Sequence, residues 1–386
     1  MEINHFFLFV YGKCGKIKKM RILILPLLKR KITPGITAAR PRVIFDLVST
    51  LCKKGHKVSI LGTGNSFVPG AKIIPVISRS FAEMGFFENP FYAHTAFLAK
   101  QAKILEKIAN NFDIIHNHCY PEFIPLLVEK NIKTPILTTI HAQMIPELDE
   151  TLFLFKKSYF VSISKAAKRQ AKKTKIYKVI YNGVDTKLYK FSAKKDDYLF
   201  WLGRLSKAKD KKGNFVDPKG VRWAIRLARE TDSKLLLSGN VEDLEFFEKD
   251  VKPYLSKKIK WIGPVATEQP LSKKEVAELM QKARAFLMTV NWQEPFGLVM
   301  AEAQSCGTPV IGFDRGSVKE LVKNGKTGFV VKARTGIRGL NMALKKIDKI
   351  NPEDCRENVE KNFSLEKMVE NYEKTYKEII RKYDKY

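Results

Sequence analysis

The chain has 386 residues, of which 45% are hydrophobic and 28% charged, a balance typical of a globular protein with a full apolar core. The length suggests two or three domains at about 150 residues each, and no apolar run approaches the roughly 18 residues that cross a bilayer. The net charge is +30, and residues 1–200 carry +19 of it, from 33 basic and 14 acidic side chains.

The N-terminal segment opens with a short apolar run, His5–Tyr11, whose lysines follow it rather than precede it. A secretory signal peptide has the reverse order. Met20 is followed directly by the strand-like run RILILP. We therefore expect residues 1–19 to be a weakly structured extension or a misassigned start, with a small membrane-touching anchor as the alternative.

Short β-rich runs then alternate with helical patterns along nearly the whole chain. The predicted strands of the first half are Arg21–Pro26, Lys57–Gly62, Lys72–Ile77, Asp113–His118, Pro135–His141, Tyr159–Ser164 and Lys178–Tyr181. Those of the second half are Tyr198–Gly203, Lys234–Gly239, Ile259–Gly263, Ala285–Val290, Pro309–Phe313 and Gly328–Val331. Helical patterns between them include Pro41–Lys54, Ala93–Asn110, Val221–Thr231 and Lys273–Arg284.

This alternation predicts an α/β fold with two doubly wound, Rossmann-like parallel sheets. Runs such as ILIL and VIGF are apolar without alternation, as in parallel strands covered on both faces. We predict an N-terminal domain over 20–185, a linker over 186–197 and a C-terminal domain over 198–365. The tail from Asn351 to Tyr386 is predicted to be helical, with 366–386 packing back on the N-terminal domain.

Two such domains facing across a cleft would place a nucleotide-type ligand between them, at the carboxyl ends of the strands. The segment EPFGLVMAE, from Glu294 to Glu302, follows a predicted strand there. A helix beginning near Gly297 would direct free amide hydrogens at a diphosphate or at sugar hydroxyls. The two carboxylates could grip different parts of one ligand; ordinary capping by Glu294 and a buried, paired Glu302 is the plainer interpretation.

Cations follow the first strand of the second half. Gly203-Arg204 comes directly after YLFWL, and Lys219-Gly220 precedes the helical run VRWAIRLARE. An arginine and a lysine at the mouth of a sheet can neutralise a diphosphate, although surface charge on a loop would look the same. Lys212 competes with Lys219 for this role, and we favour Lys219 because Gly220 opens the helix.

The chain has five cysteines, an odd number, and no CxxC pair. This favours a reducing compartment over a disulfide framework or a zinc site, so we expect a cytoplasmic protein.

The excess of basic residues reflects either a lysine-rich surface or an anionic partner, and among such partners we favour a membrane surface. We find no nucleic-acid-binding motif and do not expect nucleic acid as a partner.

Taken together, these motifs resemble the retaining glycosyltransferases of family 4, which have the GT-B fold. The resemblance spans nearly all of Met20 to Tyr386. The residues that carry it are Gly203-Arg204, Lys219-Gly220, WIGPV at Trp261–Val265, Glu294–Glu302, CGTPVIGFDRGSVKELV from Cys306, NGKTGFVV from Asn324, and YNGVD at Tyr181–Asp185.

The resemblance implies roles for individual residues. Arg204 and Lys219 would bind the donor diphosphate, Glu302 the ribose hydroxyls, and Val265 would lie near the base. Glu294, with the backbone of Phe296, Gly297 and Leu298 and with Val299 beside them, would hold the transferred sugar and the nearby phosphate. His141, in TTIHA, matches the family's sugar-facing histidine, so Glu294 and His141 are the candidate catalytic residues.

One departure lies in the N-terminal half. The family usually has a Gly-Gly loop before its first helix, whereas this chain has Ala38-Ala39, with Gly35 nearby. Alanine allows a less close approach of the backbone to a ligand. Gly35, Arg40 and Arg42 are the candidate contacts to phosphate or acceptor on this side.

Stabilising a departing diphosphate with cations and a helix N-terminus requires no metal, and the chain contains no Asp-x-Asp. We therefore expect no metal and no cofactor beyond the nucleotide-sugar donor. The acceptor, a glycan, a lipid-linked molecule or a small molecule, should contact the N-terminal domain and its aromatic stretch RSFAEMGFFENPFYAH. An epimerase or phosphorylase of the same fold, and a non-catalytic sugar-nucleotide sensor, are the alternatives.

Overall fold

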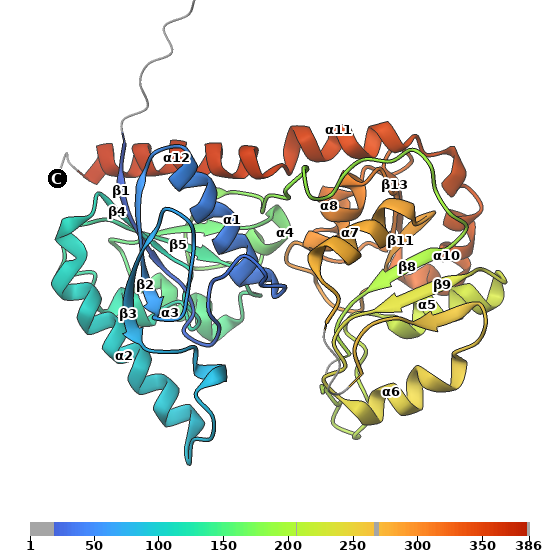
Figure 1. The fold of residues 1–386 in the computed structure, drawn as a ribbon, viewed down its shortest axis with the longest axis horizontal. Helices are drawn as coiled ribbons and strands as arrows, with labels where there is room; N and C mark the ends of the chain where they lie inside the picture. The colour runs from blue at the N-terminus through green and yellow to red at the C-terminus, as the bar shows by residue number, and fades with distance from the viewer. Residues whose placement is uncertain (1–18, 206, 266–269, 384–386) are drawn as a thin grey trace, which may run out of the picture.

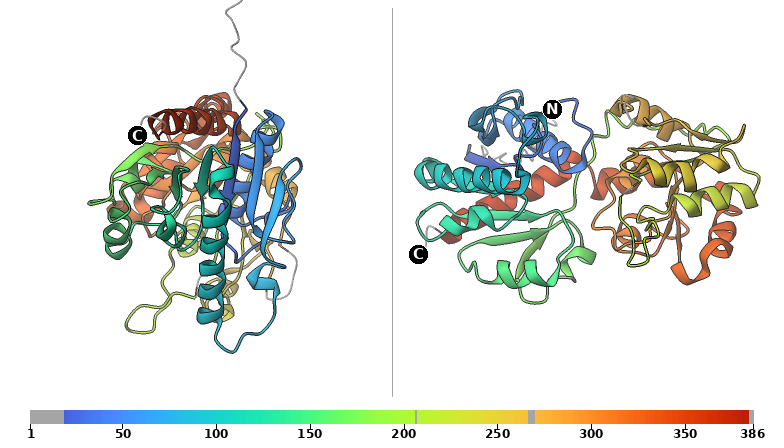
Figure 2. Two further views of the ribbon diagram at one scale, coloured as in Figure 1. Left: turned by 90° about the vertical axis from the view of Figure 1, so that its left-hand side faces the viewer. Right: turned by 90° about the horizontal axis from the view of Figure 1, so that it is seen from below.

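A computed structural model describes residues 19–205, 207–265 and 270–383. These residues form two α/β domains that lie side by side (Figure 1). The view from below shows both sheets with helices around them (Figure 2). The prediction for residues 1–19 falls, except for Lys19, outside the described residues. None of the described helices combines the length and the apolar character needed to span a bilayer.

The N-terminal domain has a seven-stranded parallel sheet in the order β3-β2-β1-β4-β5-β6-β7. Its strands are β1 Arg21–Leu25, β2 Lys57–Thr63, β3 Lys72–Ile77, β4 Ile114–Asn117, β5 Ile136–Ile140, β6 Tyr159–Ser162 and β7 Ile176–Val179. Its α-helices are α1 Ala39–Lys53, α2 Pro90–Ile108, α3 Pro146–Phe153 and α4 Lys165–Lys168.

The C-terminal domain has a six-stranded parallel sheet in the order β10-β9-β8-β11-β12-β13. Its strands are β8 Leu199–Leu202, β9 Leu235–Ser238, β10 Ile259–Trp261, β11 Ala285–Met288, β12 Val310–Phe313 and β13 Gly328–Val331. Its α-helices are α5 Val221–Glu230, α6 Leu244–Asp250, α7 Lys273–Lys282, α8 Leu298–Ser305, α9 Val318–Leu321, α10 Gly336–Leu344 and α11 Pro352–Asn362. The last helix of the chain is α12, Leu365–Tyr383.

The doubly wound α/β fold class is confirmed. Every predicted strand is present, with ends within two residues of those expected, because burial on both faces marks them in the sequence. All residues of β4, β5, β11 and β12 are buried, for example. The strand order reverses between β1 and β4 in one sheet and between β8 and β11 in the other. Ligands bind outside the carboxyl ends of strands at such reversals.

The tail, predicted to be helical, consists of two helices, α11 and α12, with a break at Phe363 and Ser364. Phe363 has a φ of −133°, outside the helical region. The break lies where the chain crosses between the domains: the Val184 amide donates to the Phe363 carbonyl at 2.9 Å, and the Leu365 amide donates to the Val184 carbonyl at 3.0 Å. Beyond it α12 packs against α1 of the N-terminal domain (Figure 1).

Candidate functional site

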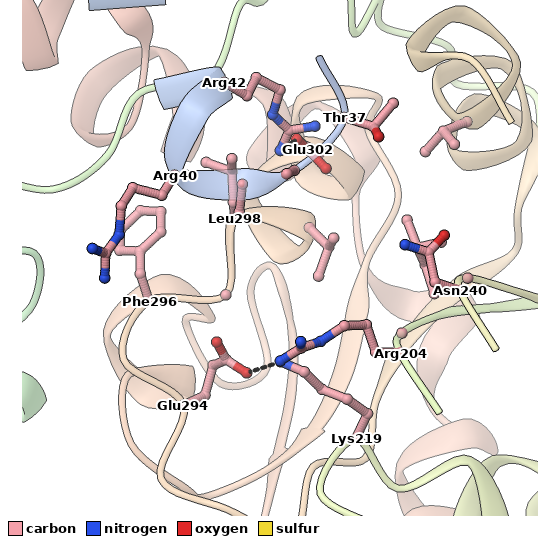
Figure 3. Close-up of a pocket in the computed structure, with 18 of the residues that line it drawn as sticks. Thr37, Arg40, Arg42, Arg204, Lys219, Asn240, Glu294, Phe296, Leu298 and Glu302 are labelled. Carbon is pink, nitrogen blue, oxygen red and sulfur yellow. Dashed lines mark hydrogen bonds and ion pairs between the residues drawn. The ribbon is translucent and has the colours of Figure 1, made fainter. Parts of the chain in front are cut away.

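A cavity of about 570 Å³ lies between the domains, where the carboxyl ends of the two sheets face each other. The start of α1 and the end of β5 form its N-terminal wall, and the loops after β8, β9 and β11 with helix α8 form the other. Figure 3 shows side chains of both domains directed into this space. The fold thus places this cavity, which is partly open to solvent, at the reversal points of both sheets.

Most of the predicted site residues line this one cavity. They are Arg40, Arg42, His141, Arg204, Lys219, Glu294, Phe296, Gly297, Leu298, Val299 and Glu302. Gly35 and Val265 are not among the lining residues, although their neighbours Ile36 and Pro264 are. Lys212 does not line the cavity either, so the geometry favours Lys219 over it. Roles inferred for single residues remain predictions, but the convergence is a property of the structure.

Helix α8 begins at the cavity wall. Its N-cap is Gly297, with a φ of +73°, and a Cβ there would lie 2.5 Å from the Met300 Cε. Glycine is therefore needed at the point where the chain turns from the cavity into the helix. The first turn of a helix leaves amide hydrogens without intrahelical partners. Leu298 and Val299 of that turn line the cavity, which makes it a suitable anion site.

Lys219 is held at the cavity by the turn before α5. Gly220 has a φ of +73°, and a Cβ on it would lie 1.7 Å from the Thr289 carbonyl oxygen, so only glycine fits. The buried Asp217 carboxylate accepts hydrogen bonds from the Gly220, Val221 and Arg222 amides at 2.7, 3.1 and 2.9 Å. These bonds cap α5 and fix the backbone that carries Lys219.

The Lys219 ammonium lies 2.8 Å from Oε2 of Glu294 (Figure 3). The same oxygen accepts a hydrogen bond from the Trp292 indole at 2.9 Å, and Lys219 lies over the Trp292 ring at 4.6 Å. Trp292 lines the cavity and was missed by our sequence reasoning. The sequence feature that could have identified Trp292 is its position, two residues before Glu294 on the same loop.

Arg204 follows β8 and is directed along the cavity wall toward Glu242. Its guanidinium lies 3.1 Å from Oε1 of Glu242, and its side chain is 58% exposed. An exposed ion pair of this kind is weak, generally below about 1 kcal/mol. Arg204 is therefore free to reorient toward an anion in the cavity.

Arg42, a candidate contact to phosphate or acceptor, lines the cavity and forms an ion pair with Glu302 across the domain interface. It also donates to the Tyr189 hydroxyl at 3.4 Å. Burial, the largest single influence, would lower the pKa of Arg42, but Glu302, Tyr189 and Asp46 together raise it above its usual value. The other oxygen of Glu302, Oε2, is buried without a hydrogen-bond partner, and the residue lines the cavity.

Arg40 is also occupied by protein groups. It donates to the Cys119 carbonyl at 3.1 Å, lies 3.5 Å from the Glu122 carboxylate, and stacks at 5.2 Å on the Tyr120 ring. Ala38 and Ala39 both line the cavity, and the backbone tolerates alanine at this point because Ala38 has a φ of −62° and α1 begins at the next residue. Negative φ is the ordinary region for alanine.

His141 ends β5 and lines the cavity. Its Nε2 lies 2.8 Å from Nδ1 of His118, which follows β4. His118 was not among the predicted site residues. The sequence feature that could have indicated it is the pair His116-x-His118 at the end of the predicted strand Asp113–His118.

Comparisons with known proteins agree with this geometry. Residues 190–362 match the family described as glycosyl transferases group 1, and residues 41–188 match glycosyltransferase family 4. The chain is 26% identical over 368 residues to N-acetyl-alpha-D-glucosaminyl L-malate synthase of Bacillus anthracis, covering 87% of this chain and 93% of that protein.

Solved glycosyltransferase structures share the two-domain fold. Sucrose-phosphate synthase of Thermosynechococcus elongatus has a TM-score of 0.74 at 17% identity, covering 94% of this chain and 100% of that one. HepE of Anabaena, solved in complex with UDP and glucose, has a TM-score of 0.65 at 18% identity, covering 93% and 100%. The fold is thus GT-B, and the two family matches together span nearly all of both domains. The chain belongs to the group 1, family 4 glycosyltransferases.

Proposed function

We propose that this glycosyltransferase moves a sugar from a nucleoside diphosphate sugar to an acceptor hydroxyl, with retention of anomeric configuration and without a metal ion. The observation that carries the proposal is the convergence of Arg204, Lys219, Glu294, Glu302 and the α8 N-terminus on one interdomain cavity. These groups match the parts of such a donor: cations for the diphosphate and carboxylates for hydroxyls.

Breaking the bond between the sugar and the diphosphate leaves positive charge on the sugar ring and negative charge on the departing phosphate. Lys219, Arg204 and the amide hydrogens of α8 are suited to stabilise that negative charge. Glu294, 7% exposed, is suited to accept hydrogen bonds from the sugar once Lys219 turns to the phosphate. Glu302 has one free oxygen for a ribose hydroxyl.

Uridine nucleotides are the first donors to test, because HepE was solved with UDP and glucose bound. We infer the retaining outcome from the family resemblance, and metal independence from the cations that line the cavity. We propose His141 as a contact of the transferred sugar, and Trp292 as an additional contact that orients Glu294.

The acceptor is proposed to enter along the N-terminal domain. In its aromatic stretch, Phe81 and Phe87 stack on each other at 4.6 Å and pack near Phe97, so they are structural. Phe86, Phe91 and Tyr92 are 92%, 79% and 73% exposed. This exposed group is our candidate contact for a lipid-linked acceptor or for peripheral membrane attachment; a soluble glycan or small molecule would not need it.

The test combines ligand-induced stabilisation with turnover. A panel of UDP-, GDP- and ADP-sugars is screened by thermal shift, where a donor at 100 times its Kd should stabilise by roughly 2.7 kcal/mol. The best donor is then assayed for nucleotide release with candidate acceptors, with and without EDTA, and the product anomer is read by NMR. Full turnover in EDTA and a retained anomer are expected; loss of turnover or an inverted anomer would contradict the proposal.

Glu294→Gln serves as the matched variant, because it keeps the shape of the side chain and removes its charge. It should remain folded and lose transfer. Product formation from donor alone, or from donor with inorganic phosphate, would instead indicate an epimerase or a phosphorylase. Donor binding without turnover, whichever acceptor is added, would indicate a sugar-nucleotide sensor.

A further inference from the structure

Behind His141 lies a row of buried histidines that the proposed chemistry does not use. His116 lies on β4, His118 directly follows that strand, and both side chains are fully buried. The rings of His116 and His118 lie 3.9 Å apart, and those of His118 and His141 lie 5.1 Å apart. The row therefore leads from the interior of the N-terminal domain to the cavity wall.

The contact with His118 uses one of the two ring nitrogens of His141. Nε2 of His141 faces Nδ1 of His118 at 2.8 Å, a hydrogen bond in which one nitrogen donates and the other accepts. Because His141 lines the cavity and its Nε2 faces inward, Nδ1 is the ring nitrogen left for a ligand. The tautomer of His118 decides whether Nδ1 of His141 carries a proton, and so whether it can donate a hydrogen bond to a ligand.

His118 has one unpartnered nitrogen, and this selects the tautomer. Its Nε2 is buried with no hydrogen-bond partner. A proton on that nitrogen would be a buried donor without an acceptor, which costs roughly 1–3 kcal/mol and is rarer than an unpaired acceptor. The proton of His118 therefore belongs on Nδ1, where it is donated to Nε2 of His141. The proton of His141 then lies on Nδ1, toward the cavity.

The surroundings keep these rings neutral. Burial, followed by the positive charge of Arg40, lowers the pKa of His118 to about 3 and that of His141 well below its usual value. Burial and the two neighbouring histidines do the same for the pKa of His116. Each ring therefore carries a single proton at neutral pH, as the argument on the tautomers requires.

Helix α12 holds the row from behind. Nδ1 of His116 lies 2.6 Å from the Tyr376 hydroxyl, and its Nε2 lies 2.8 Å from Oγ1 of Thr139. The Tyr372 hydroxyl lies 3.0 Å from the same Thr139 oxygen. Both tyrosines belong to α12, which crosses from the other domain.

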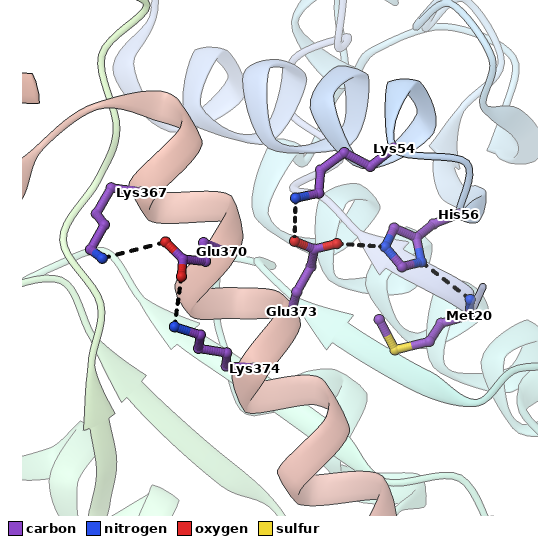
Figure 4. A network of polar contacts seen from close by, with 7 residues as sticks. All are labelled: Met20, Lys54, His56, Lys367, Glu370, Glu373 and Lys374. Atoms are coloured by element: carbon purple, nitrogen blue, oxygen red, sulfur yellow. Dashed lines mark hydrogen bonds and ion pairs between the residues drawn. The ribbon is translucent and has the colours of Figure 1, made fainter. Parts of the chain in front are cut away.

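The position of α12 is itself fixed by a buried ion pair. Glu373 accepts hydrogen bonds from the Lys54 ammonium at 2.7 Å and from Nε2 of His56 at 2.8 Å, and Nδ1 of His56 accepts from the Met20 amide at 3.2 Å (Figure 4). Among the described residues, Glu370, one turn earlier, pairs with Lys367 and Lys374 of the same helix. Glu373 is therefore one of the charged residues that anchor α12 on the N-terminal domain; Glu378, which accepts from Lys178 at 2.7 Å, is another.

We propose that His118 is a positioning residue that fixes His141 as a neutral hydrogen-bond donor, with its Nδ1–H directed at a substrate hydroxyl in the cavity. This rests on the proposed function for the identity of that hydroxyl. A donor fixed in this way orients the substrate without exchanging a proton with it. His141 is thereby a binding and orienting group rather than a general acid.

The first test reads the tautomer directly and needs no turnover. Long-range ¹H–¹⁵N spectra of protein labelled at histidine nitrogens distinguish Nδ1–H from Nε2–H imidazole, and His141→Gln assigns the His141 signals among the six histidines. We expect His141 as the Nδ1–H form and His118 also as the Nδ1–H form. An Nε2–H His141 in the folded protein would overturn the proposal.

The second test substitutes His118 by two residues of similar polarity. Asparagine places an N–H two bonds from Cβ, where His118 carries Nδ1, whereas glutamine places it one bond further. We expect His118→Asn to retain kcat within about threefold and His118→Gln to lower kcat by roughly 10- to 100-fold, with the donor KM changed little. Equal losses in both variants, or a loss confined to donor KM, would overturn the proposal.

Thr174→Val is the control, because Thr174 is a buried polar residue of the same domain that donates to the Asp149 carbonyl at 2.8 Å and does not line the cavity. Its kcat should equal that of the wild type. Circular dichroism and melting temperature establish that each variant is folded. If His118→Gln does not fold, the spectra of the wild type and of His118→Asn still decide the tautomer. Transfer without the predicted tautomer would contradict this inference alone, and the tautomer without any transfer would contradict the proposed function alone.

Discussion

At the residue scale, the cleft pairs each expected ligand-binding cation with a nearby carboxylate. Lys219 lies beside Glu294, Arg204 beside Glu242, and Arg42 beside Glu302. These pairs limit repulsion between cations gathered in one cavity before a diphosphate arrives. Binding a diphosphate would then exchange internal ion pairs for contacts to phosphate oxygens, and the freed carboxylates would face the sugar and ribose hydroxyls.

Lys219→Met removes the cation while keeping the aliphatic stem on Trp292. We expect donor affinity to fall by about tenfold or more, because a charge-assisted bond to phosphate contributes roughly 1.5–3 kcal/mol. Isothermal titration with the donor identified above measures this. Lys212→Met is the matched control on the same loop, outside the cavity, and should bind as the wild type does; equal weakening in both would exclude a specific role for Lys219.

Asp46, on α1, gives the interface a pH dependence. Burial raises its pKa to about 6, partly offset by Lys273 and Arg42, while Asp185 and Glu302 add to the rise. The folded state therefore binds a proton more tightly than the unfolded chain, and this group contributes less stability as pH rises from about 4 to above 6.

Asp46→Asn should therefore stabilise the protein at pH 8, by on the order of 2 kcal/mol, and have little effect near pH 4. Thermal unfolding of both proteins across this range measures the difference. A gap in melting temperature that stays constant with pH, or that widens on acidification, would contradict the assignment.

At the element scale, the sequence predicted where strands lie because their apolar runs are buried on both faces. It could not predict the break at Phe363, because that break depends on backbone bonds to Val184, which lies far away in the chain.

For the candidate site, the motif around Glu294 indicated which residues gather in the cavity. The Arg42 contact to Glu302 could not be predicted, since it arises only when two domains meet. Trp292 was accessible to sequence reasoning, whereas the partner of His141 required the packing of β4 beside β5.

The turn before α5 allows a sharp test of how that element is positioned. Gly220→Ala would place a Cβ 1.7 Å from the Thr289 carbonyl, so the turn must move, at a cost on the order of 3 kcal/mol or more. Gly213→Ala is the matched control, because its φ of +80° is similar but nothing lies within 4 Å of its Cβ. It should cost about 1 kcal/mol. Urea unfolding compares the two, and equal costs would show that the close approach to Thr289 is not limiting.

At the scale of the whole molecule, several polar contacts join the domains beside the covalent crossings, and two of them illustrate how the domains are held together. One is the pair of Arg42 with Glu302 at the cavity. The other is the Glu320 carboxylate on α9, which accepts from the Lys165 and Ala166 amides at 2.8 and 2.6 Å and so caps α4 of the other domain. Opening the cleft fully would break both contacts. Domain motion therefore depends on whether Glu302 is paired with Arg42.

Arg42→Met should destabilise the protein by roughly 3–5 kcal/mol, because it leaves the Glu302 carboxylate buried and unpaired. Adding Glu302→Gln should recover most of that loss, since an amide is cheaper to bury than a lone charge. Chemical denaturation of the wild type, both single variants and the double variant gives the coupling energy. Strictly additive losses would show that the two side chains do not interact in solution.

The placement of α12 has a consequence for how the protein is made. This helix follows the whole C-terminal domain in the sequence, yet it covers α1 and β4, which precede that domain. Domains generally fold in the order of their synthesis, but here the N-terminal domain keeps a face uncovered until α12 has been synthesised. That face therefore stays exposed while the C-terminal domain is made, and the C-terminal domain can mature before the N-terminal one is finished.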